Sequence, residues 1–397
     1  MRLLSYAIFV TMMLLVGGGM HFYIWTRLGR DPGWPSPWPK VTLGVAMALV
    51  VAVPLAVATH RALPRAVARI LSLPAYVWMG VVFLLFVLVA ASDLLRAARA
   101  GLEFVMNAAA GKEPAAPDPE RRRLMARATA GAITTVAATA SVTAVRGGLA
   151  DVEVKEVEVP LPRLPKTLEG LTIVQLTDVH VGPTIGRKDI EALVEKCNAA
   201  RPDVVVITGD LVDGSVAQLG EHTAPLSKIE ARWGKYFVTG NHEYYSGVTP
   251  WLKELDRLGY RALRNERVEI GDAGATIDLA GVDDANAHRF GNGHGPDVAR
   301  AVAGRDPDRE LVLLAHQPKT IADTAGHGVG LQISGHTHGG QIWPFGGLVR
   351  LAQPYVSGLY RHDEKTQIYV SHGAGYWGPP MRLLAPSEIS KLVLVSA

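Results

Sequence analysis

The chain divides into an apolar N-terminal part and a C-terminal part in which short apolar runs alternate with amphipathic stretches. Three apolar runs without an acidic or basic residue lie near the N-terminus: Leu3 to Trp25, Val41 to Thr59 and Ile70 to Ala91. Each is close to the roughly 20 residues that a helix needs to cross the hydrocarbon core of a bilayer. Since a helix in a soluble core is rarely apolar on every face over such a length, the pattern predicts three transmembrane helices.

A fourth segment, Ala128 to Val145, is long enough to span a bilayer, but its many Ala and Thr residues make insertion marginal. The basic cluster Arg121 to Arg123 precedes it and is typical of a cytoplasmic anchor. By the distribution of Lys and Arg, the loops after the first and third spans share the cytoplasm. If the fourth segment crosses the membrane, everything after Arg146 is extracytoplasmic, and otherwise it stays inside. We expect an integral protein of the cell membrane with its C-terminal part outside the cytoplasm.

From Asp151 onward the pattern is typical of an α/β domain. We therefore predict a membrane region over 1–150, with three or four transmembrane helices and a basic linker, and a separate domain over 151–397. The predicted buried strands are Leu171 to Leu176, Val204 to Thr208, Tyr236 to Thr239, Leu311 to Ala315 and Leu331 to Ser334. The predicted helices are Arg187 to Ala200 and a segment through Leu258 with Thr249 as N-cap and Pro250 as first helical residue.

Polar residues that can bind metals follow each of these strands. In chain order the strands are followed by Asp178 and His180, by Asp210 and Asp213, by Asn241 with His242 and Glu243, by His316, and by His336 and His338. Ligands of α/β sheets gather at the carboxyl ends of the strands. We therefore expect these side chains to converge on one crevice.

Charge and cysteine content narrow the choice of partners and metals. The 40 basic and 37 acidic side chains leave a formal net charge of only +3, so we expect no nucleic acid partner. The single cysteine, Cys197, excludes an internal disulfide and a Cys-rich zinc module. A mixed set of carboxylates, imidazoles and one amide suits divalent Mn, Fe or Zn.

The number of candidate ligands exceeds what one ion needs. The predicted metal ligands are Asp178, His180, Asp210, Asn241, His316, His336 and His338. They are enough for two ions that share a bridging carboxylate, with a metal-bridging hydroxide as the nucleophile. Such a pair of ions also stabilises the charge that develops on phosphate oxygens during attack.

The same residues, in the order Asp-x-His, Gly-Asp-x-x-Asp, Gly-Asn-His-Glu, His and Gly-His-Thr-His, resemble the motifs of the calcineurin-like metallophosphoesterase family. The resemblance covers about Leu171 to His338, and the extension Gly339 to Ile342 resembles the membrane-associated branch of the family. It implies a four-layer αββα sandwich, here preceded by an all-α transmembrane region. It also implies a role for each ligand.

By this resemblance, the carboxylate of Asp210 bridges two metals. Asp178, His180 and His338 complete one metal site, and Asn241, His316 and His336 complete the other. His242 does not bind metal but contacts the substrate phosphate and protonates the leaving oxygen.

The expected function is that of a membrane-anchored phosphoesterase, acting on a phosphodiester or a phosphomonoester that can be lipid-linked, with membrane lipid as a further partner. The alternative is a noncatalytic transport or sensing protein whose phosphoesterase-like domain binds a ligand. Two nearby side chains are assigned other roles. Asp213 is interpreted as a helix cap or as a hydrogen-bond partner of a ligand. His372 could approach the site from a late strand, but a loop histidine with its own hydrogen-bond partners explains it at least as well, so we leave it out of the ligand set.

Overall fold

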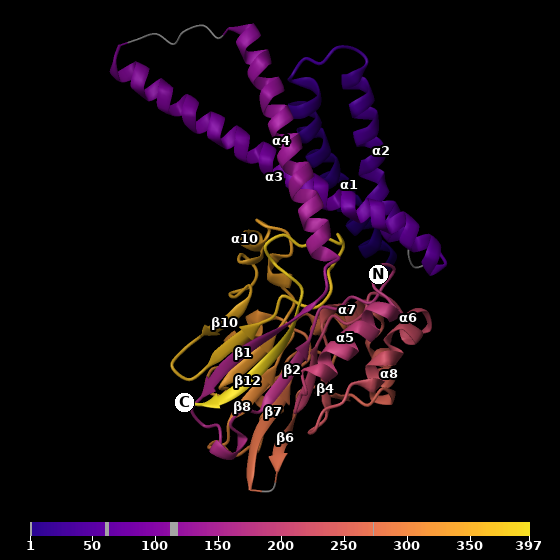
Figure 1. Ribbon diagram of the computed structural model, residues 1–397, viewed down its shortest axis with the longest axis vertical. Coiled ribbons are helices and arrows are strands. Elements are labelled where there is room, and N and C mark those ends of the chain that lie inside the picture. Colours follow the sequence, from indigo (N-terminus) through magenta and orange to yellow (C-terminus); the bar gives the residue numbers. More distant parts are fainter. Residues whose placement is uncertain (1, 60–62, 112–117, 273) are drawn as a thin grey trace. The chain divides into compact units, whose positions relative to one another are not determined.

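The computed structural model describes residues 2–59, 63–111, 118–272 and 274–397. It divides into two compact units, Met1–Val145 and Arg146–Ala397 (Figure 1). The first unit is helical, and the second contains every β-strand of the described residues.

The helices of the first unit are α1 (Arg2–Trp25), α2 (Trp38–Thr59), α3 (Arg65–Ala109) and α4 (Pro119–Gly148), which ends in the second unit. Among the described residues, three helices are long and apolar enough to cross a bilayer: α2 over Trp38–Val57, α3, and α4. The segment 128–145, which the sequence left open, lies within α4 and so belongs to these three. The segment Leu3 to Trp25 forms α1, and its role as a span stays a prediction.

Helix α3 continues well beyond the apolar run that ends at Ala91. The following residues include Asp93, Arg96 and a pair between Arg99 and Glu103 whose charged atoms lie 2.7 Å apart at i,i+4 spacing. Ala, Leu, Arg and Glu are strong helix formers, so loss of apolar character does not end the helix. The apolar run therefore marks the membrane candidate but not the full length of the helix.

The second unit contains two six-stranded sheets. The first has the order β1-β12-β2-β3-β4-β5 and the second the order β10-β11-β9-β8-β7-β6. The strands of the first sheet are β1 (Glu153–Leu161), β2 (Thr172–Leu176), β3 (Val204–Thr208), β4 (Lys235–Val238), β5 (Arg261–Ala262) and β12 (Glu388–Ser396). Those of the second are β6 (Glu266–Asp272), β7 (Ala275–Gly281), β8 (Leu311–Leu314), β9 (Leu331–Ser334), β10 (Gly358–Arg361) and β11 (Gln367–Val370).

The two sheets pack face to face because their strands carry apolar side chains on the faces that meet. Val204 and Val206 of β3 belong to the cluster between the sheets, together with Leu279 of β7. The alternate residues Val205 and Ile207 face the helices instead. Successive side chains of a strand point to opposite faces, so one apolar run serves two layers of core.

Helices cover the outer faces of both sheets. The first sheet packs against α5 (Arg187–Ala199), α6 (Val216–Thr223) and α8 (Val248–Arg257), which lie together on one side of the unit (Figure 1). The second sheet is covered more thinly, by α9 (Val298–Ala301) and the 3-10 helix Pro318–Thr324. The other short α-helices of the described residues are α7 (Asn241–Ser246) and α10 (Gly346–Val349). The unit is a four-layer αββα sandwich.

The start of α8 differs from the sequence prediction. The helix begins at Val248 and its N-cap is Gly247, whose φ of 102° is in the left-handed region, so Thr249 is not the cap. Pro250 then occupies the third helical position. It is tolerated there because the first four N–H groups of a helix have no partner inside the helix.

Candidate metal centre

The predicted site residues occupy the loops that follow five strands. Asp178 and His180 follow β2, Asp210 follows β3, Asn241 and His242 begin α7 after β4, His316 follows β8, and His336 and His338 follow β9. Strands β2, β3 and β4 are parallel neighbours in the first sheet, and β8 and β9 are parallel neighbours in the second. The site therefore lies at the carboxyl ends of strands from both sheets.

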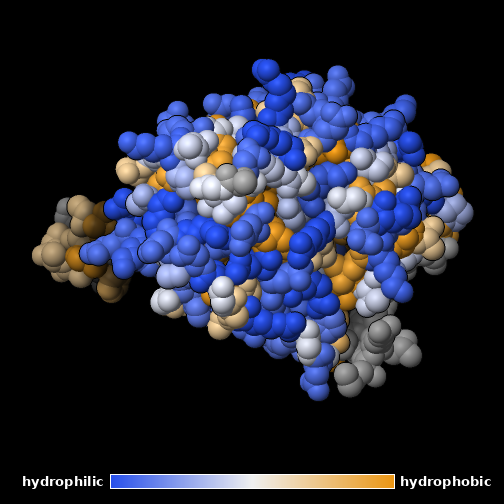
Figure 2. Space-filling view, turned by 90° about the horizontal axis from the view of Figure 1, so that it is seen from below, coloured by the Kyte–Doolittle hydropathy of each residue, from blue (hydrophilic) through white to orange (hydrophobic). Residues whose placement is uncertain are grey.

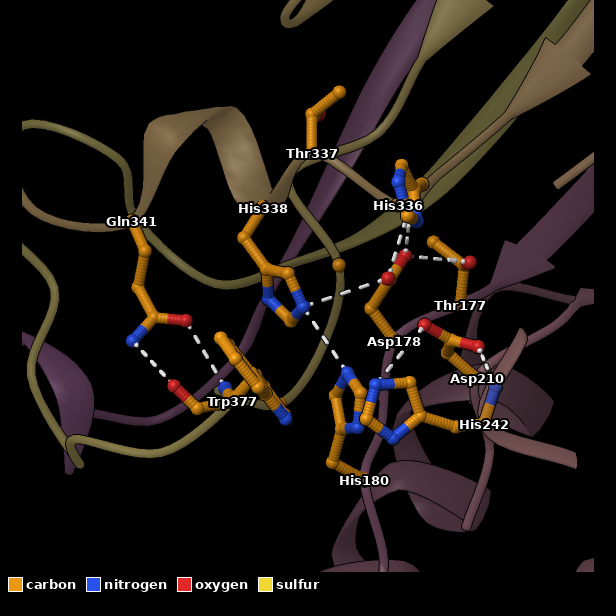
Figure 3. A network of polar contacts seen from close by, with 12 residues as sticks. Thr177, Asp178, His180, Asp210, His242, His336, Thr337, His338, Gln341 and Trp377 are labelled. Atoms are coloured by element: carbon orange, nitrogen blue, oxygen red, sulfur yellow. Dashed lines mark hydrogen bonds and ion pairs between the residues drawn. The ribbon is translucent and has the colours of Figure 1, made fainter. Parts of the chain in front are cut away.

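One group of possible ligand atoms is formed by Asp178, His180 and His338, whose ligand atoms lie within 4.8 Å of one another. The Nε2 atoms of His180 and His338 are 3.1 Å apart, and His338 Nε2 is 3.4 Å from Asp178 Oδ1. Figure 3 shows the three side chains pointing toward one another. All three are buried.

A second group is formed by Asp210, His316 and His336. His316 Nε2 lies 3.1 Å from Asp210 Oδ2 and 3.1 Å from His336 Nδ1. Asn241 begins α7, and the N–H of the next residue, His242, donates to Asp210 Oδ1 over 2.9 Å. The structure thus brings six of the seven predicted ligands into two groups and holds the seventh beside Asp210.

The donor atoms of this site fit divalent metal ions. Oδ1 of Asn241 is buried and accepts no hydrogen bond from any described residue, which is a costly state for an amide oxygen that lacks a ligand. Nδ1 of His316 lies 2.7 Å from the carbonyl oxygen of Thr208, to which it can donate, and this bond orients Nε2 toward Asp210. Oxygen and imidazole donors together suit Mn, Fe or Zn.

The backbone of the site is strained. Five predicted ligands have φ in the left-handed region: 52° for Asp178, 53° for His180, 51° for Asp210, 71° for His336 and 51° for His338. Such conformations cost non-glycine residues about 1–3 kcal/mol each and cluster at functional sites. The rest of the sandwich has to offset this cost in free energy. Five strained residues in one place are therefore typical of a binding site.

Glycines allow the loops to approach one another. A Cβ on Gly335 would overlap the side chains of Asp178 and Thr177, and a Cβ on Gly240 would overlap the Asp210 carboxylate. Neither position could hold a larger residue without displacing a predicted ligand.

Asp213 is bonded to two histidines of the site. Its Oδ1 lies 2.5 Å from Nδ1 of His242 and 3.2 Å from Nδ1 of His180. It does not cap a helix, because the N-cap of α6 is Ser215. Asp213, His180 and His242 also form a third group with close ligand atoms. We interpret Asp213 as their hydrogen-bond partner, because it contacts the ring nitrogens opposite Nε2.

The pKa values of the predicted histidine ligands are shifted in both directions. Burial lowers the pKa of His316, but the carboxylate of Asp210 outweighs burial and raises the pKa well above its ordinary value. Burial lowers the pKa of His336 to about 3, with His316 as a further cause, and burial with His180 holds the pKa of His338 well below its ordinary value. Both rings are therefore neutral at pH 7 and offer a lone pair. Burial raises the pKa of Asp210, but His316 and His242 outweigh it, so the pKa is well below its ordinary range and the carboxylate is ionised.

The pKa of His242 is shifted in the opposite direction. Burial lowers it, but the carboxylates of Asp210 and Asp213 outweigh burial and raise the pKa to about 9. Nε2 of His242 lies 3.9 Å from Asp210 Oδ2, and the side chain is 16% exposed. The ring is therefore protonated at neutral pH and borders the second group.

Two supporting residues were not assigned roles from the sequence. The buried carboxylate of Glu243 accepts the N–H groups of Asp210, Leu211 and Gly240. Its position three residues after Gly240, at the start of a helix, was the available signal, since a Glu there reaches back to the N-cap N–H. The other supporting residue is Arg382.

The guanidinium of Arg382 is buried and donates to backbone carbonyls. Its acceptors are the carbonyl oxygens of His338, His372, Gly373, Gly375 and Ala385. It thus joins the loop after β9 to the loop after β11. No sequence signal marks it, because backbone carbonyls are present at every position.

His372, which the sequence analysis left out of the ligand set, belongs to none of the three groups found among the described residues. Its Nδ1 lies 3.1 Å from the carbonyl oxygen of Pro386 and 3.5 Å from Glu388 Oε2. The ring therefore has hydrogen-bonding partners of its own in the loop.

Comparison with known proteins agrees with this geometry. The model of the calcineurin-like phosphoesterase family matches residues 171–340. An uncharacterized metallophosphoesterase of Helicobacter pylori is 45% identical over 249 residues, which cover 62% of this chain and 65% of that protein. A transmembrane protein with metallophosphoesterase domain from Bos taurus is 42% identical over 298 residues, covering 72% of this chain and 66% of that protein.

An uncharacterized metallophosphoesterase of Aquifex aeolicus is 34% identical over 237 residues, which cover 59% of this chain and 89% of that protein. The chain spans less than two thirds of the Helicobacter and bovine proteins. The strand-end ligand groups, the family match and these relatives together show that the chain belongs to the calcineurin-like metallophosphoesterase family.

Proposed function

We propose that this protein is a membrane-anchored binuclear metallohydrolase that cleaves a phosphodiester or phosphomonoester. The observation that carries the proposal is the presence of two groups of His and Asp ligand atoms, one of which contains Asp210, together with Oδ1 of Asn241, which has no hydrogen-bond partner among the described residues. The proposed division is a membrane region over 1–150 and a catalytic domain over 151–397.

The proposed metal ligands are taken from the two groups of ligand atoms, with Asn241 added to the second group. Asp178, His180 and His338 would hold one divalent ion, and Asn241, His316 and His336 would hold the other. Two bound ions would activate water and offset the charge that develops on the phosphate oxygens.

Asp210 is the proposed bridging ligand. One of its oxygens, Oδ2, faces His316, and the other accepts the N–H of His242. Glu243 accepts the N–H of Asp210 itself and so fixes the loop from the other side. These bonds would hold the carboxylate in position before a metal ion binds. The site would then not have to rearrange when the reaction takes place.

His242 is the proposed general acid. Its Nδ1 is held by Asp213, so its Nε2 remains available to give a proton to the oxygen of the departing alcohol. The rings of Tyr245 and Trp377 lie edge-on to the His242 ring, at centroid distances of 5.4 Å and 6.0 Å. Both rings therefore border the proposed proton donor.

The substrate that we propose is a phosphate ester borne on a lipid. Three candidate spans tie the catalytic domain to a bilayer, and tethering raises the local concentration of substrates in the same membrane. We also propose that the catalytic domain faces away from the cytoplasm. An enzyme reporter that is active only outside the cytoplasm, fused after Arg146, would then be active, and silence would place the domain inside.

Hydrolysis of model substrates by the purified full-length chain tests the proposal. The chain, stripped of metal and then supplied with Mn, Fe or Zn, is given bis-p-nitrophenyl phosphate and p-nitrophenyl phosphate. We expect metal-dependent turnover that is lost in Asp210→Asn and in His242→Ala, and the preferred compound separates diesterase from monoesterase activity. Failure to bind metal would refute the proposal. Two bound ions without turnover of any phosphate ester, lipid-linked esters included, would favour a noncatalytic domain.

A further inference from the structure

Exposed apolar side chains of the second unit concentrate in two segments of the chain. Six large hydrophobic residues come from residues 343–351 and 377–384, and we call them the apolar rim: Trp343, Phe345, Leu348, Leu351, Trp377 and Leu384. Leu351 is 84% exposed and Leu384 is 80% exposed. Single exposed apolar residues are ordinary, but a group of large ones marks an interaction surface.

The apolar rim is held together by backbone hydrogen bonds. Ile342 and Leu383 form a β-bridge, in which Trp343 N–H donates to Leu383 O over 3.1 Å and Leu383 N–H donates to Gln341 O over 2.9 Å. The side-chain amide of Gln341 donates to the carbonyl oxygen of Trp377 (Figure 3). The exposure is therefore a property of an ordered structure, not of a frayed loop.

The opposite end of the second unit has a different surface. In Figure 1, α10 lies at one end of this unit and strand β6 reaches the other. Seen from the end that β6 reaches, the unit shows mainly hydrophilic side chains (Figure 2). Asp308 is exposed shortly before the amino end of β8, whereas the apolar rim lies among loops that follow the carboxyl ends of strands.

The first residues of the second unit indicate which kind of surface the apolar rim contacts. Gly147 and Gly148 lie against Arg382 and Pro380 so closely that a Cβ on either glycine would overlap the backbone there. These glycines are the last residues of α4, a candidate membrane span. The chain that leaves this span therefore packs directly on the segment that carries Leu384.

The composition of the apolar rim suits the surface of a bilayer. Trp and Phe rings are favoured at the level of the lipid headgroups, and Leu side chains enter the acyl region. Arg350 is exposed beside Leu351, where its charge can meet lipid phosphates while its stem lies along apolar surface.

We propose that the apolar rim inserts into the interface of the bilayer in which the chain's own helices lie. The contact would hold the second unit against the membrane at a second point besides the end of α4. It does not depend on the proposed hydrolysis, and a noncatalytic domain would make the same contact. If the proposed function also holds, Trp377 continues the apolar rim to His242, and the site opens beside the lipid surface.

Spin-label accessibility on the full-length chain in lipid nanodiscs tests this contact, because both faces of a nanodisc are open to solvent. The native thiol does not interfere: Cys197 is fully buried, and burial raises its pKa to about 12. Single cysteines are introduced as Leu351→Cys and, separately, Leu384→Cys, with Asp308→Cys as the matched exposed control. Each is labelled with a nitroxide, and its collision rates with oxygen and with a water-soluble nickel chelate are measured.

We expect the labels at Leu351 and Leu384 to favour collisions with oxygen and the label at Asp308 to favour the nickel chelate. Labels at Leu351 and Leu384 that behave like the one at Asp308 would show that the apolar rim faces water, and the proposal would be wrong. Labels shielded from both reagents, with a short distance between copies in pulsed dipolar spectroscopy, would assign the apolar rim to a protein interface and overturn the proposal as well. Neither readout requires enzymatic activity.

Discussion

Oδ1 of Asp213 lies 2.5 Å from Nδ1 of His242. The same oxygen lies 3.2 Å from Nδ1 of His180, so one carboxylate orients both the proposed acid and a proposed metal ligand. An anion at this position also favours the protonated form of His242. Asp213 is thus a positioning residue that links the proposed proton donor, His242, to a proposed metal ligand, His180.

Replacing the carboxylate of Asp213 by an amide tests this coupling. We expect Asp213→Asn to lower metal affinity or kcat/KM about 10–100-fold, because hydrogen-bond partners of metal-binding histidines contribute on this scale. Metal titration and steady-state kinetics measure the two effects. Asp256→Asn is the control, since Asp256 is exposed on α8 and lies outside the site. Equal activities in the two variants would show that Asp213 does not position either histidine.

The close approach of Gly335 to Asp178 leads to a second prediction. A methyl group at Gly335 would displace the Asp178 carboxylate, so Gly335→Ala should bind less metal and lose most of its activity. Gly220→Ala is the matched control, because a Cβ at Gly220 in helix α6 meets only ordinary contacts. That control should gain about 0.5–1 kcal/mol of stability, as expected for Gly to Ala inside a helix. Full metal content in Gly335→Ala would contradict the crowding argument.

Oδ1 of Asn241 has no hydrogen-bond partner in the described part of the chain, and this leads to a third prediction. In Asn241→Ala we expect the bound metal to fall from two ions toward one, since the other proposed ligand group does not include Asn241. Elemental analysis of the purified variant after dialysis gives the ratio of metal to protein. Retention of two ions would remove Asn241 from the ligand set.

Glu388 leads to a prediction about stability and pH. Burial raises its pKa, but His372 and the Tyr369 hydroxyl outweigh burial, so the folded pKa lies below the ordinary value of 4.5. The Tyr369 hydroxyl donates to Glu388 over 2.6 Å. A carboxyl whose folded pKa is depressed contributes stability above its unfolded pKa, and the contribution is lost as pH falls through the folded pKa.

The difference in Tm between the parent chain and Glu388→Gln should therefore be largest above about pH 4.5 and shrink as the pH falls further. Thermal unfolding followed by intrinsic fluorescence from pH 3 to pH 7, approximately the range in which carboxyls titrate, measures this difference. A difference that stays constant over this range would show that the ionised carboxylate is not the stabilising form.

Local sequence determined the central strands and the order of the candidate ligands. Strands β3 and β9 have the predicted bounds, because β3 is a short run of mostly apolar residues, β9 alternates apolar and polar residues, and a glycine follows each. The ligands could be proposed for a similar reason, since each directly follows a strand and its chemical type is visible in the sequence. The apolar helices of the first unit were also visible, because apolar length is a local property.

Only the tertiary structure decided which candidate ligands lie close together and which residues hold them in position by hydrogen bonds. The sequence does not show that β3 and β8 belong to different sheets, yet this division places His316 opposite Asp210. The buried Arg382 depends on carbonyl groups from the segments after β9 and β11, and the two bonds of Asp213 depend on residues that follow β2 and β4. Strand pairing and buried hydrogen bonds join residues that are distant along the chain, so no local pattern of side chains encodes them.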